Sequence, residues 1–440
     1  MSILRIELRR SAAAGAALLA FAVGVAALYL ARGRWADGWL PLALTMKEYL
    51  LLLWPIALAA GAWQGRREHR TKVGELFDTT PRSPLRRMLP VLVAMGATLG
   101  LAYVLVVVAG GVQLASTGGY FPPDVVAIVL VGALSLVAAT WLGLGIGRLL
   151  PALLTAPVLA VAGVLLVFFT AVMQPDWLAA VLSPAYGSGS FYPFQTIDAG
   201  VTAALAIWMV GLALTGVLLL VVRGRRALLA AALPVLLGFG AAAAIVPRDE
   251  AALVAPIDPV ARELVCTGDA PKVCVTRVHA NVLDTLAPLA REGLAVLAKL
   301  PNAPTQAHEE RRAYLTEGPP ARDLDVVTMN IRIDERGGLA HPDAVVPEMV
   351  FGLGTGYSDM RCDRNGAVER AAAYYLLGRE PVSAVEAIPE MIQEDPEITV
   401  EAVALWQGLQ ELPEAEALSR VTAVRDAILA CRDSTGLLSR

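Results

Sequence analysis

The stretch AWQGRREHRTKVGELFDTTPRSPLRR, residues 62–87, separates two long apolar segments and decides how the rest of the chain is arranged. It contains seven of the 36 basic residues, mixed with Pro, Thr and Glu, although the whole chain has a net charge of −4. Arg and Lys next to membrane-spanning helices hold short loops on the cytoplasmic side of a membrane. The stretch therefore predicts a cytoplasmic loop between two membrane spans.

The composition of the whole chain predicts a membrane protein. Hydrophobic residues make up 56% of the 440 residues, charged residues make up 17%, and the mean hydropathy is +0.58. An average soluble domain has about a quarter charged residues. Residues 1–246 contain 17 basic and nine acidic residues, whereas residues 247–440 contain 19 basic and 31 acidic residues. We therefore expect a membrane domain followed by an acidic domain in water.

Seven apolar segments reach the length of about 20 residues that a membrane-crossing helix needs. Their predicted bounds are 11–31, 42–64, 88–112, 125–147, 152–173, 199–222 and 227–246. With a cytoplasmic N-terminus, 14 basic residues fall in the cytoplasmic segments, against only Arg32, Arg34 and Lys47 around the first external loop. The positive-inside rule thus predicts a multi-pass protein of the cell membrane with a cytoplasmic N-terminus and an extracytoplasmic C-terminal domain.

Some features within the predicted spans have two interpretations. Lys47 and Glu48, near the outer end of the second span, can form a functional polar pair, or Lys47 can reach the membrane interface while Glu48 stays hydrated; the second interpretation is preferred. The stretches GATLG (96–100) and GLGIG (143–147) have the glycine spacing of closely packed membrane helices. Packing within one chain is favoured over a contact between two chains.

The cysteines also bear on which side of the membrane the second domain lies. All four, Cys266, Cys274, Cys362 and Cys431, follow residue 247. An even number of cysteines in one segment predicts disulfides if that segment faces an oxidising compartment. Three pairings are possible. Cys266–Cys274, closing a short hairpin, together with Cys362–Cys431 is favoured, and four buried free thiols are the alternative.

A family resemblance rests on the sequence PIALAAGAWQGRREHRTKVGELFDTTPRSPLRRML, residues 55–89. It resembles the region between the second and third spans of actinobacterial permease subunits of type-2 ABC exporters. In that family this loop contains a coupling helix that binds the partner ATPase. The resemblance covers roughly residues 1–225 and implies a core of six spans. An additional transmembrane helix at 226–247 and an outer domain at 248–440 lie outside that pattern.

The resemblance implies a set of ATPase-coupling residues. Glu75, Leu76, Phe77 and Asp78 would lie on the coupling helix, flanked by Arg66, Arg67, Glu68 and Arg70. It further implies two cytoplasmic ABC ATPase subunits, a second permease subunit in a homo- or heterodimer, and contact with membrane lipid, but no nucleic acid. The alternative for this loop is an anchor that binds phospholipid head groups without a protein partner.

The resemblance also implies short re-entrant helices between the fifth and sixth spans, where residues 174–200 read QPDWLAAVLSPAYGSGSFYPFQTIDAG. Tryptophan and tyrosine are enriched where a membrane meets water. We expect the aromatic residues of this stretch at the outer membrane interface. These are Trp177, Tyr186, Phe191, Tyr192 and Phe194.

The sequence does not predict catalysis by this chain. A phosphate-binding loop needs a Gly-Lys dipeptide, which is absent from the sequence, so ATP hydrolysis is expected in a partner. The region from CVTRVHA to AVERAAAYYLLGREP is faintly similar to gluzincin aminopeptidases, whose zinc site needs H-E-x-x-H. The nearest string, HEERR at 308–312, lacks the second His, and His279 and His341 are isolated. We expect a degenerate, non-catalytic domain without metal or cofactor.

The predicted fold class is a polytopic α-helical membrane domain, with six core spans plus a seventh, followed by an extracytoplasmic, helix-rich α+β domain. Residue periodicity predicts strands in KVCVTRVHA and DLDVVTMNIRI, and helices in the 280–300 region and in three later stretches. The predicted function is a permease subunit that exports a lipophilic or amphipathic substrate. The alternatives are a membrane-tethered sensor or binding protein, whose spans serve mainly as an anchor, and a membrane-anchored peptidase.

Overall fold

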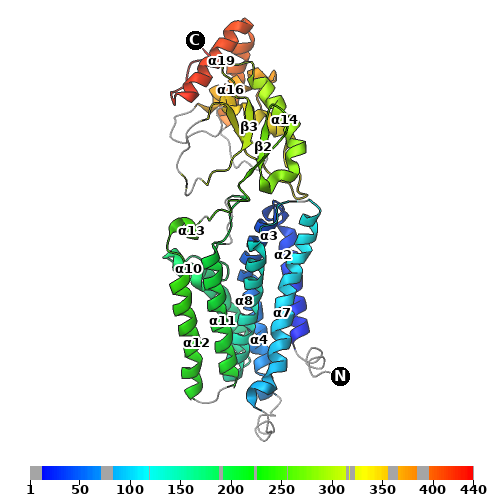
Figure 1. Cartoon of the computed structure of the whole chain (residues 1–440), viewed down its shortest axis with the longest axis vertical. Coiled ribbons are helices and arrows are strands. Elements are labelled where there is room, and N and C mark those ends of the chain that lie inside the picture. Colours follow the sequence, from blue (N-terminus) through cyan, green and yellow to red (C-terminus); the bar gives the residue numbers. More distant parts are fainter. Residues whose placement is uncertain are drawn as a thin grey trace. The chain divides into compact units, whose positions relative to one another are not determined.

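The structure is a computed structural model of the 440-residue chain. It describes residues 12–70, 83–117, 119–187, 192–221, 225–254, 256–313, 317, 323–354, 365–383 and 396–439. The chain divides into two compact units, Met1–Asp258 and Pro259–Arg440 (Figure 1).

The first unit is formed by helices, most of which run alongside one another (Figure 1). Its described helices are α2 (Ala13–Leu30), η1 (Arg32–Arg34), α3 (Trp39–Glu48), α4 (Leu50–Gly65), α5 (Arg67–Arg70), α7 (Pro84–Ala115), α8 (Asp124–Leu149), α9 (Thr155–Ala171), α10 (Asp176–Leu182), α11 (Ala199–Val221), α12 (Arg225–Ile245) and α13 (Glu250–Val254).

Four of these helices, α2, α7, α8 and α11, are long and apolar enough to cross a membrane. Helices α3 and α4 meet at a bend of 48° and add a fifth if they form one broken span. Helix α9 and the apolar part of α12, Leu229–Ile245, are shorter. The helical membrane unit expected from the sequence is thus present in its coarse form, while the number of seven spans stays a prediction.

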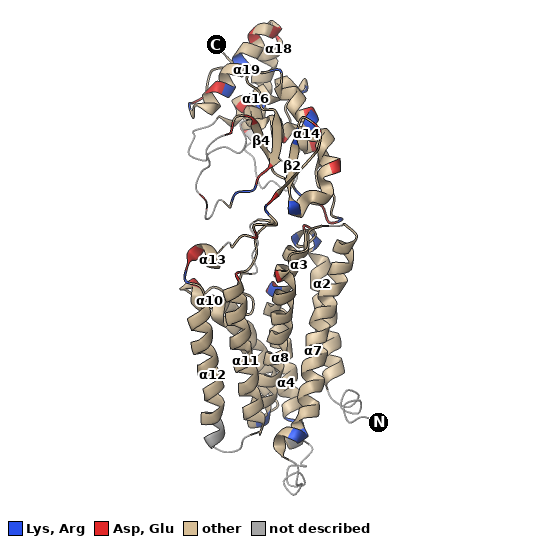
Figure 2. Cartoon of the chain, viewed as in Figure 1, with Lys and Arg blue, Asp and Glu red and all other residues tan. Residues whose placement is uncertain are grey.

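The outer surface of this helical unit is apolar, and its charged residues lie mainly near the helix ends (Figure 2). Helix α9 illustrates the surface, because Val158, Val161, Leu165 and Phe169 follow one another at helical spacing and are 50–63% exposed. A continuous apolar stripe of this kind is unfavourable in water but matches the hydrocarbon of a bilayer. The helical unit therefore has a surface compatible with a membrane protein.

Helices α4 and α8 are in backbone contact through glycines on both sides. A Cβ atom placed on Gly61 of α4 would lie 2.2 Å from the Thr140 carbonyl oxygen of α8, and one on Gly143 of α8 would lie 2.1 Å from the Leu58 carbonyl oxygen of α4. Any side chain at either position would collide with the facing backbone. The expectation that GLGIG (143–147) packs within the chain is confirmed.

The glycines of GATLG (96–100) also pack within the chain, against α8. A Cβ atom on Gly96 would lie 2.8 Å from Nε1 of Trp141, whose indole N–H donates to the Leu92 carbonyl oxygen at 3.0 Å. On its other side α8 meets α11, since a Cβ atom on Gly216 would lie 2.3 Å from the Trp141 carbonyl carbon. Helix α8 is thus the central helix of the unit.

The connection between α10 and α11 packs on the segment that ends the first unit. The Thr196 N–H donates to the Pro256 carbonyl oxygen at 2.8 Å, and the Asp258 N–H donates to that of Phe194 at 3.0 Å. The Tyr120 hydroxyl donates to the Asp258 carboxylate at 3.1 Å. The first unit therefore continues to Asp258, beyond the domain boundary expected at residue 248.

The aromatic residues of this connection do not all lie where they were expected. Phe194 is only 1% exposed and stacks on Tyr192 with ring centroids 5.5 Å apart, so it belongs to the core and not to the membrane interface. The Trp177 ring lies 3.7 Å from the Arg248 guanidinium carbon. Burial raises the pKa of Tyr186 to about 12, so its hydroxyl stays protonated and donates to the Leu253 carbonyl oxygen. Phe191 lies outside the described residues.

The second unit combines a small sheet with helices (Figure 1). Its described elements are β1 (Leu264–Cys266), β2 (Val273–Thr276), η2 (Arg277–Val282), α14 (Leu283–Leu297), β3 (Gln306–Glu309), β4 (Val326–Met329), α15 (Pro342–Val350), η3 (Phe351–Gly354), α16 (Gly366–Leu377), α18 (Pro396–Gln410) and α19 (Glu414–Leu429). The four strands have the order β1-β2-β3-β4.

The connections explain the sheet. Strands β1 and β2 form an antiparallel hairpin, whereas β2, β3 and β4 are parallel. Parallel neighbours need a long crossover, which α14 provides between β2 and β3. Leu286, Ala290, Leu294 and Leu297 recur at helical spacing on α14 and are buried in the core of this unit. The helices predicted from periodicity are present, but the strand expected across 272–280 ends at Thr276, where η2 begins.

The hairpin carries one of the two expected disulfides. Cys266 and Cys274 lie opposite each other on β1 and β2, with Cα atoms 4.0 Å apart, and are bonded. This pairing is confirmed. Cys431 is also disulfide-bonded, and its expected partner, Cys362, lies outside the described residues.

The α4–α8 contact makes a prediction that reverses the usual preference of helices for alanine. We expect Gly143→Ala to lower the stability of the detergent-solubilised protein by about 1–3 kcal/mol, because the new methyl group collides with the Leu58 carbonyl oxygen. Thermal unfolding followed by tryptophan fluorescence would measure the change. Gly240→Ala on α12 is the control, because a Cβ atom there meets nothing within 4 Å and alanine favours the helix by up to about 1 kcal/mol. Equal melting temperatures for the two variants would contradict the prediction.

Candidate functional site

The proposed coupling segment begins where α4 ends. Helix α4 stops at Gly65, and the short helix α5 starts at Arg67. A Cβ atom on Gly65 would lie 2.3 Å from the Leu144 carbonyl oxygen and 3.1 Å from the Arg148 backbone nitrogen. The start of the segment is therefore held in backbone contact with the C-terminal end of α8.

Most of the coupling residues inferred from the sequence cannot be placed. Glu75, Leu76, Phe77 and Asp78 lie outside the described residues, as do the side chains of Glu68 and Arg70. Arg66 and Arg67 are described, and both are partly buried at the end of α4 and the start of α5. On the far side of the gap, α7 begins with Pro84 in its first turn after Ser83.

Two arginine side chains characterise this end of the helical unit. The Arg66 guanidinium carbon lies 5.0 Å from the centroid of the Trp63 ring, and its Nε and Nη1 are buried without a hydrogen-bond acceptor in the described part of the chain. Arg148, at the end of α8, donates from Nη1 to the Leu220 carbonyl oxygen of α11. Guanidinium groups bind carboxylates and phosphates through paired N–H donors, so Arg66 is suited to an anionic group of a partner or a lipid.

The break between α3 and α4 contains the charged residues of the second span. Residues 40–47 of α3 are all buried, so other parts of the unit enclose the helix on every side. Lys47 is only 4% exposed, so its side chain lies within the protein, which corrects the preferred interpretation that it extends outward to the membrane interface. Glu48 remains one-third exposed and forms an ion pair with Arg34, with 2.5 Å between Oε2 and Nη2.

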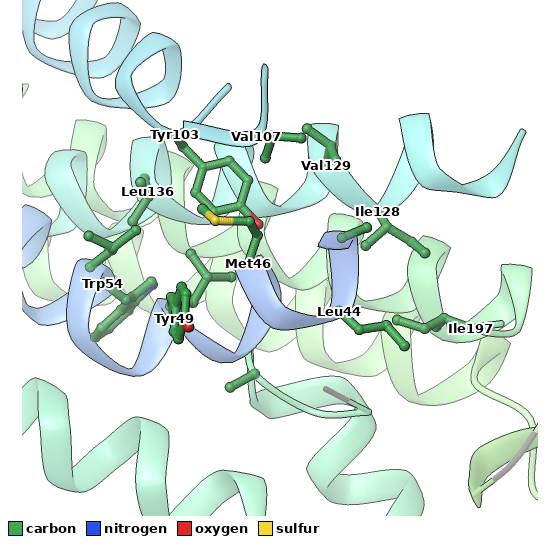
Figure 3. Packing of buried hydrophobic residues seen from close by; sticks show 14 of the residues in the cluster. Leu44, Met46, Tyr49, Trp54, Tyr103, Val107, Ile128, Val129, Leu136 and Ile197 are labelled. Carbon is green, nitrogen blue, oxygen red and sulfur yellow. The ribbon is translucent and has the colours of Figure 1, made fainter. Parts of the chain in front are cut away.

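Hydrogen bonds to the end of α2 fix the position of this break. The Tyr49 hydroxyl donates to the Ala27 carbonyl oxygen at 2.9 Å. Trp35, which is fully buried, donates from its indole nitrogen to the Leu28 carbonyl oxygen at 2.8 Å. The Tyr49 ring and its neighbours pack in one apolar cluster with residues of α7 and α8 (Figure 3). The bend is therefore held by contacts on both sides.

The second unit contains a buried acid–base pair that the sequence did not reveal. Nδ1 of His279 lies 2.6 Å from Oε1 of Glu309, and the two side chains are 1% and 4% exposed. Oε2 of Glu309 accepts hydrogen bonds from the Thr276 N–H at 2.6 Å and from its hydroxyl at 2.9 Å. His279 was expected to be isolated, and this expectation is wrong. Its partner is 30 positions away in the sequence but adjacent in space.

The string HEERR does not form the helical turn of a zinc peptidase. His308 and Glu309 are neighbours on strand β3, and successive side chains of a strand point to opposite faces. Burial and the nearby charge of Arg311 lower the pKa of His308, so its imidazole is neutral at pH 7. Glu348 forms an ion pair with Arg332 at 2.6 Å. Within the described ranges, no three His, Cys, Asp or Glu side chains are grouped for a metal ion.

Comparisons of the chain with protein-family models, with curated proteins and with solved structures found no match. A functional interpretation therefore depends on the residues and contacts of the chain itself. Three features could take part in binding or catalysis. They are the basic segment after α4, the buried Lys47 beside a helix break, and the His279–Glu309 pair. The first two belong to the membrane unit and the third to the second unit.

The buried pair predicts a large effect from a small substitution. We expect Glu309→Gln to destabilise the sheet of the second unit by about 3 kcal/mol, because an amide cannot accept all the hydrogen bonds that the carboxylate takes from Thr276 and His279. Hydrogen–deuterium exchange of the β2 and β3 amides in the full-length protein would measure the loss. The control is Glu263→Gln, which removes the ion pair between Glu263 and Arg277. The Glu263 side chain is 54% exposed, so this substitution should change the free energy of unfolding by less than about 0.5 kcal/mol. Unchanged exchange in Glu309→Gln would show that the pair is not structural.

Proposed function

We propose that the chain is the permease subunit of an ATP-driven type-2 ABC exporter. The observation that supports this most directly is the strongly basic segment of residues 62–87, which connects α4 to α7 and begins at the point where α4 is in backbone contact with α8. A cytoplasmic ATPase that pulled on this segment would act on two membrane helices at once. The seven basic residues would hold the segment at the cytoplasmic face.

The glycine contacts support a route for this movement through the unit. Helix α4 is in contact with α8 at Gly61 and Gly143, and α8 is in contact with α11 at Gly145 and Gly216, where a Cβ atom on Gly145 would lie 2.6 Å from the Gly216 carbonyl oxygen. Closely packed backbones transmit displacement because little compressible space lies between them. Helices α4, α8 and α11 would therefore move together when the coupling segment moves.

The proposal includes the remaining parts of a transport complex. ATP hydrolysis would take place in two cytoplasmic ATPase subunits, since the sequence contains no Gly-Lys dipeptide for a phosphate-binding loop of its own. A second permease subunit would complete the membrane path. Seven crossings would place the second unit, with its Cys266–Cys274 bond, outside the cytoplasm, where disulfides are stable. The cargo would be lipophilic or amphipathic.

A membrane-tethered sensor or binding protein is the second candidate. The second unit favours it, because this unit has its own hydrophobic core and its own disulfide, and so has the features of an independent extracytoplasmic module. In that case the apolar helices would serve as an anchor, and the basic segment would contact lipid head groups. The two candidates differ in whether an ATPase binds the basic segment.

Affinity purification separates these candidates. We expect the full-length chain, purified from its native membrane, to retain a subunit with a phosphate-binding loop and to hydrolyse ATP. Glu75→Arg should reduce the retained ATPase at least fivefold, because the added positive charge lies on the predicted docking helix. The control is the same charge reversal at Glu401, which is exposed on α18 of the second unit and should have no effect. A chain that retains no ATPase in either form would favour the tethered module.

Sidedness has a test of its own. In intact cells, a membrane-impermeant maleimide should label Asp269→Cys in the β1–β2 hairpin, because the second unit is proposed to be extracytoplasmic. His69→Cys, which is exposed on α5, should react only after the cells are permeabilised. Mass-tagged gels would measure both reactions. If His69→Cys were labelled in intact cells and Asp269→Cys were protected, the proposed orientation would be reversed.

A further inference from the structure

The membrane unit contains a buried amine to which the described residues offer no acceptor. Lys47 is 4% exposed, and the described residues supply neither a hydrogen bond nor an ion pair to it. The neighbouring charges do not compensate it, because Glu48 and Arg34 form a bidentate pair with each other, at 3.0 and 2.5 Å. The carboxylate next to Lys47 in the chain is thus already paired with Arg34 and does not neutralise the buried amine.

An amine in this position is unfavourable unless an anion joins it. An ammonium group removed from water without a partner is costly, and ionisable residues inside membrane domains commonly face a substrate path. Only four of the 36 basic residues in the chain are lysines: Lys47, Lys72, Lys272 and Lys299. Lys47 is the one among them that lies within a predicted span. A long, flexible side chain with a compact charge can follow a bound anion through small rearrangements.

The backbone next to Lys47 points to the same site independently. Helix α3 ends at Glu48 and α4 begins at Leu50 at an angle of 48°. Broken membrane helices are common at the substrate sites of transporters, where irregular backbone lines a protein-enclosed path. Lys47 lies two residues before this break.

Two other buried donor groups lie in the same apolar cluster. The Tyr103 hydroxyl and the Trp54 indole N–H belong to side chains that are 1% and 2% exposed, and neither has a hydrogen-bond partner among the described residues. Figure 3 shows Tyr103 and Trp54 in the same cluster as Met46 and Tyr49, the residues that flank Lys47 and Glu48. Gly132 of α8 leaves room for the Tyr103 hydroxyl, since a Cβ atom there would lie 2.4 Å from its oxygen. The indole N–H can only donate and the hydroxyl can also donate, so both suit the oxygen atoms of an anion.

We propose that Lys47 binds the acidic head group, a carboxylate or a phosphoester, of an amphipathic anion whose hydrocarbon chain lies among the apolar residues around the α3–α4 break. The ammonium group supplies the positive charge, and Tyr103 and Trp54, which belong to the same apolar cluster, offer further donors for head-group oxygens. Leu44, one turn before Lys47, points toward Ile197 in this apolar environment (Figure 3). The identification of this anion as cargo rests on the proposed exporter function, whereas the binding site itself does not.

The test uses the full-length chain purified in dodecyl maltoside without any ATPase. Native mass spectrometry would measure binding of oleate, of dodecyl phosphate and of neutral monoolein. We expect at least one of the two anions to bind the wild-type chain, and Lys47→Met to weaken that binding at least tenfold. Lys47→Arg should keep binding within about threefold, because it keeps the charge. Tyr103→Phe should weaken binding several-fold. Lys299→Met is the control, because Lys299 donates to the Leu376 carbonyl oxygen in the second unit.

Thermal unfolding distinguishes a ligand site from a structural lysine. Without anion, Lys47→Met should melt at the same or a higher temperature than the wild type, since it replaces a buried charge by an apolar side chain. The anion should then raise the melting temperature of the wild type and not that of the variant. Equal anion binding by the wild type and Lys47→Met, or a much lower melting temperature of Lys47→Met alone, would overturn the proposal.

The same measurements also identify the chemical class of the anion, and they test the anion site and the exporter function separately. Preference for oleate would identify a carboxylate ligand, and preference for dodecyl phosphate a phosphoester such as a lipid head group; either supports the site. Lys47-dependent anion binding by a chain that retains no ATPase would refute the exporter function and keep the site. An ATPase-bound chain that takes up neither anion through Lys47 would refute the site and leave the exporter function intact.

Discussion

The backbone contact between α4 and α8 is the constraint on which the membrane unit depends. Lipid tails are as apolar as leucine, so burying leucine against another helix gains little in a bilayer, and close van der Waals contact has to supply the attraction. Gly61 and Gly143 allow that contact by placing carbonyl oxygens of each helix where a side chain would otherwise be. Because α8 also meets α11 through Gly216, the three helices form the most closely packed part of the unit.

This packing also explains the enclosure of α3. The chain that enters α4 must first pass between α2, α7 and α8, and every residue from Leu40 to Lys47 is buried there. The chain bends by 48° between α3 and α4, and α4 then makes the glycine contact with α8. The hydrogen bond from Tyr49 to the end of α2 stabilises the bend. The burial of Lys47 follows from this route. Its side chain was expected at an interface but lies inside the protein because the helix before the break is enclosed.

Much of the coarse fold follows from the sequence, whereas the local chemistry does not. Long apolar runs identify α2, α7, α8 and α11, because a helix in lipid needs little more than length and composition. The Cys266–Cys274 hairpin was predictable because its residues are close in sequence. Lys47 was misplaced because the sequence does not show which helices surround α3. The His279–Glu309 pair was missed for a related reason, although both residues lie at or just beyond the carboxyl ends of neighbouring parallel strands, a position that could have suggested it.

The two units are stabilised by different interactions, and this difference accounts for the uneven composition of the chain. In the membrane unit, contact between backbones replaces the hydrophobic effect, so glycine and alanine are frequent and charges lie mainly near the helix ends (Figure 2). In the second unit, water drives Val273, Leu286 and their neighbours into a core, and polar groups such as Glu309 can be buried because Thr276 and His279 satisfy them. Among the described residues of the membrane unit, Lys47 has neither a hydrogen bond nor an ion pair although it is 4% exposed, so the partner that we propose for it is a group that the chain itself does not supply.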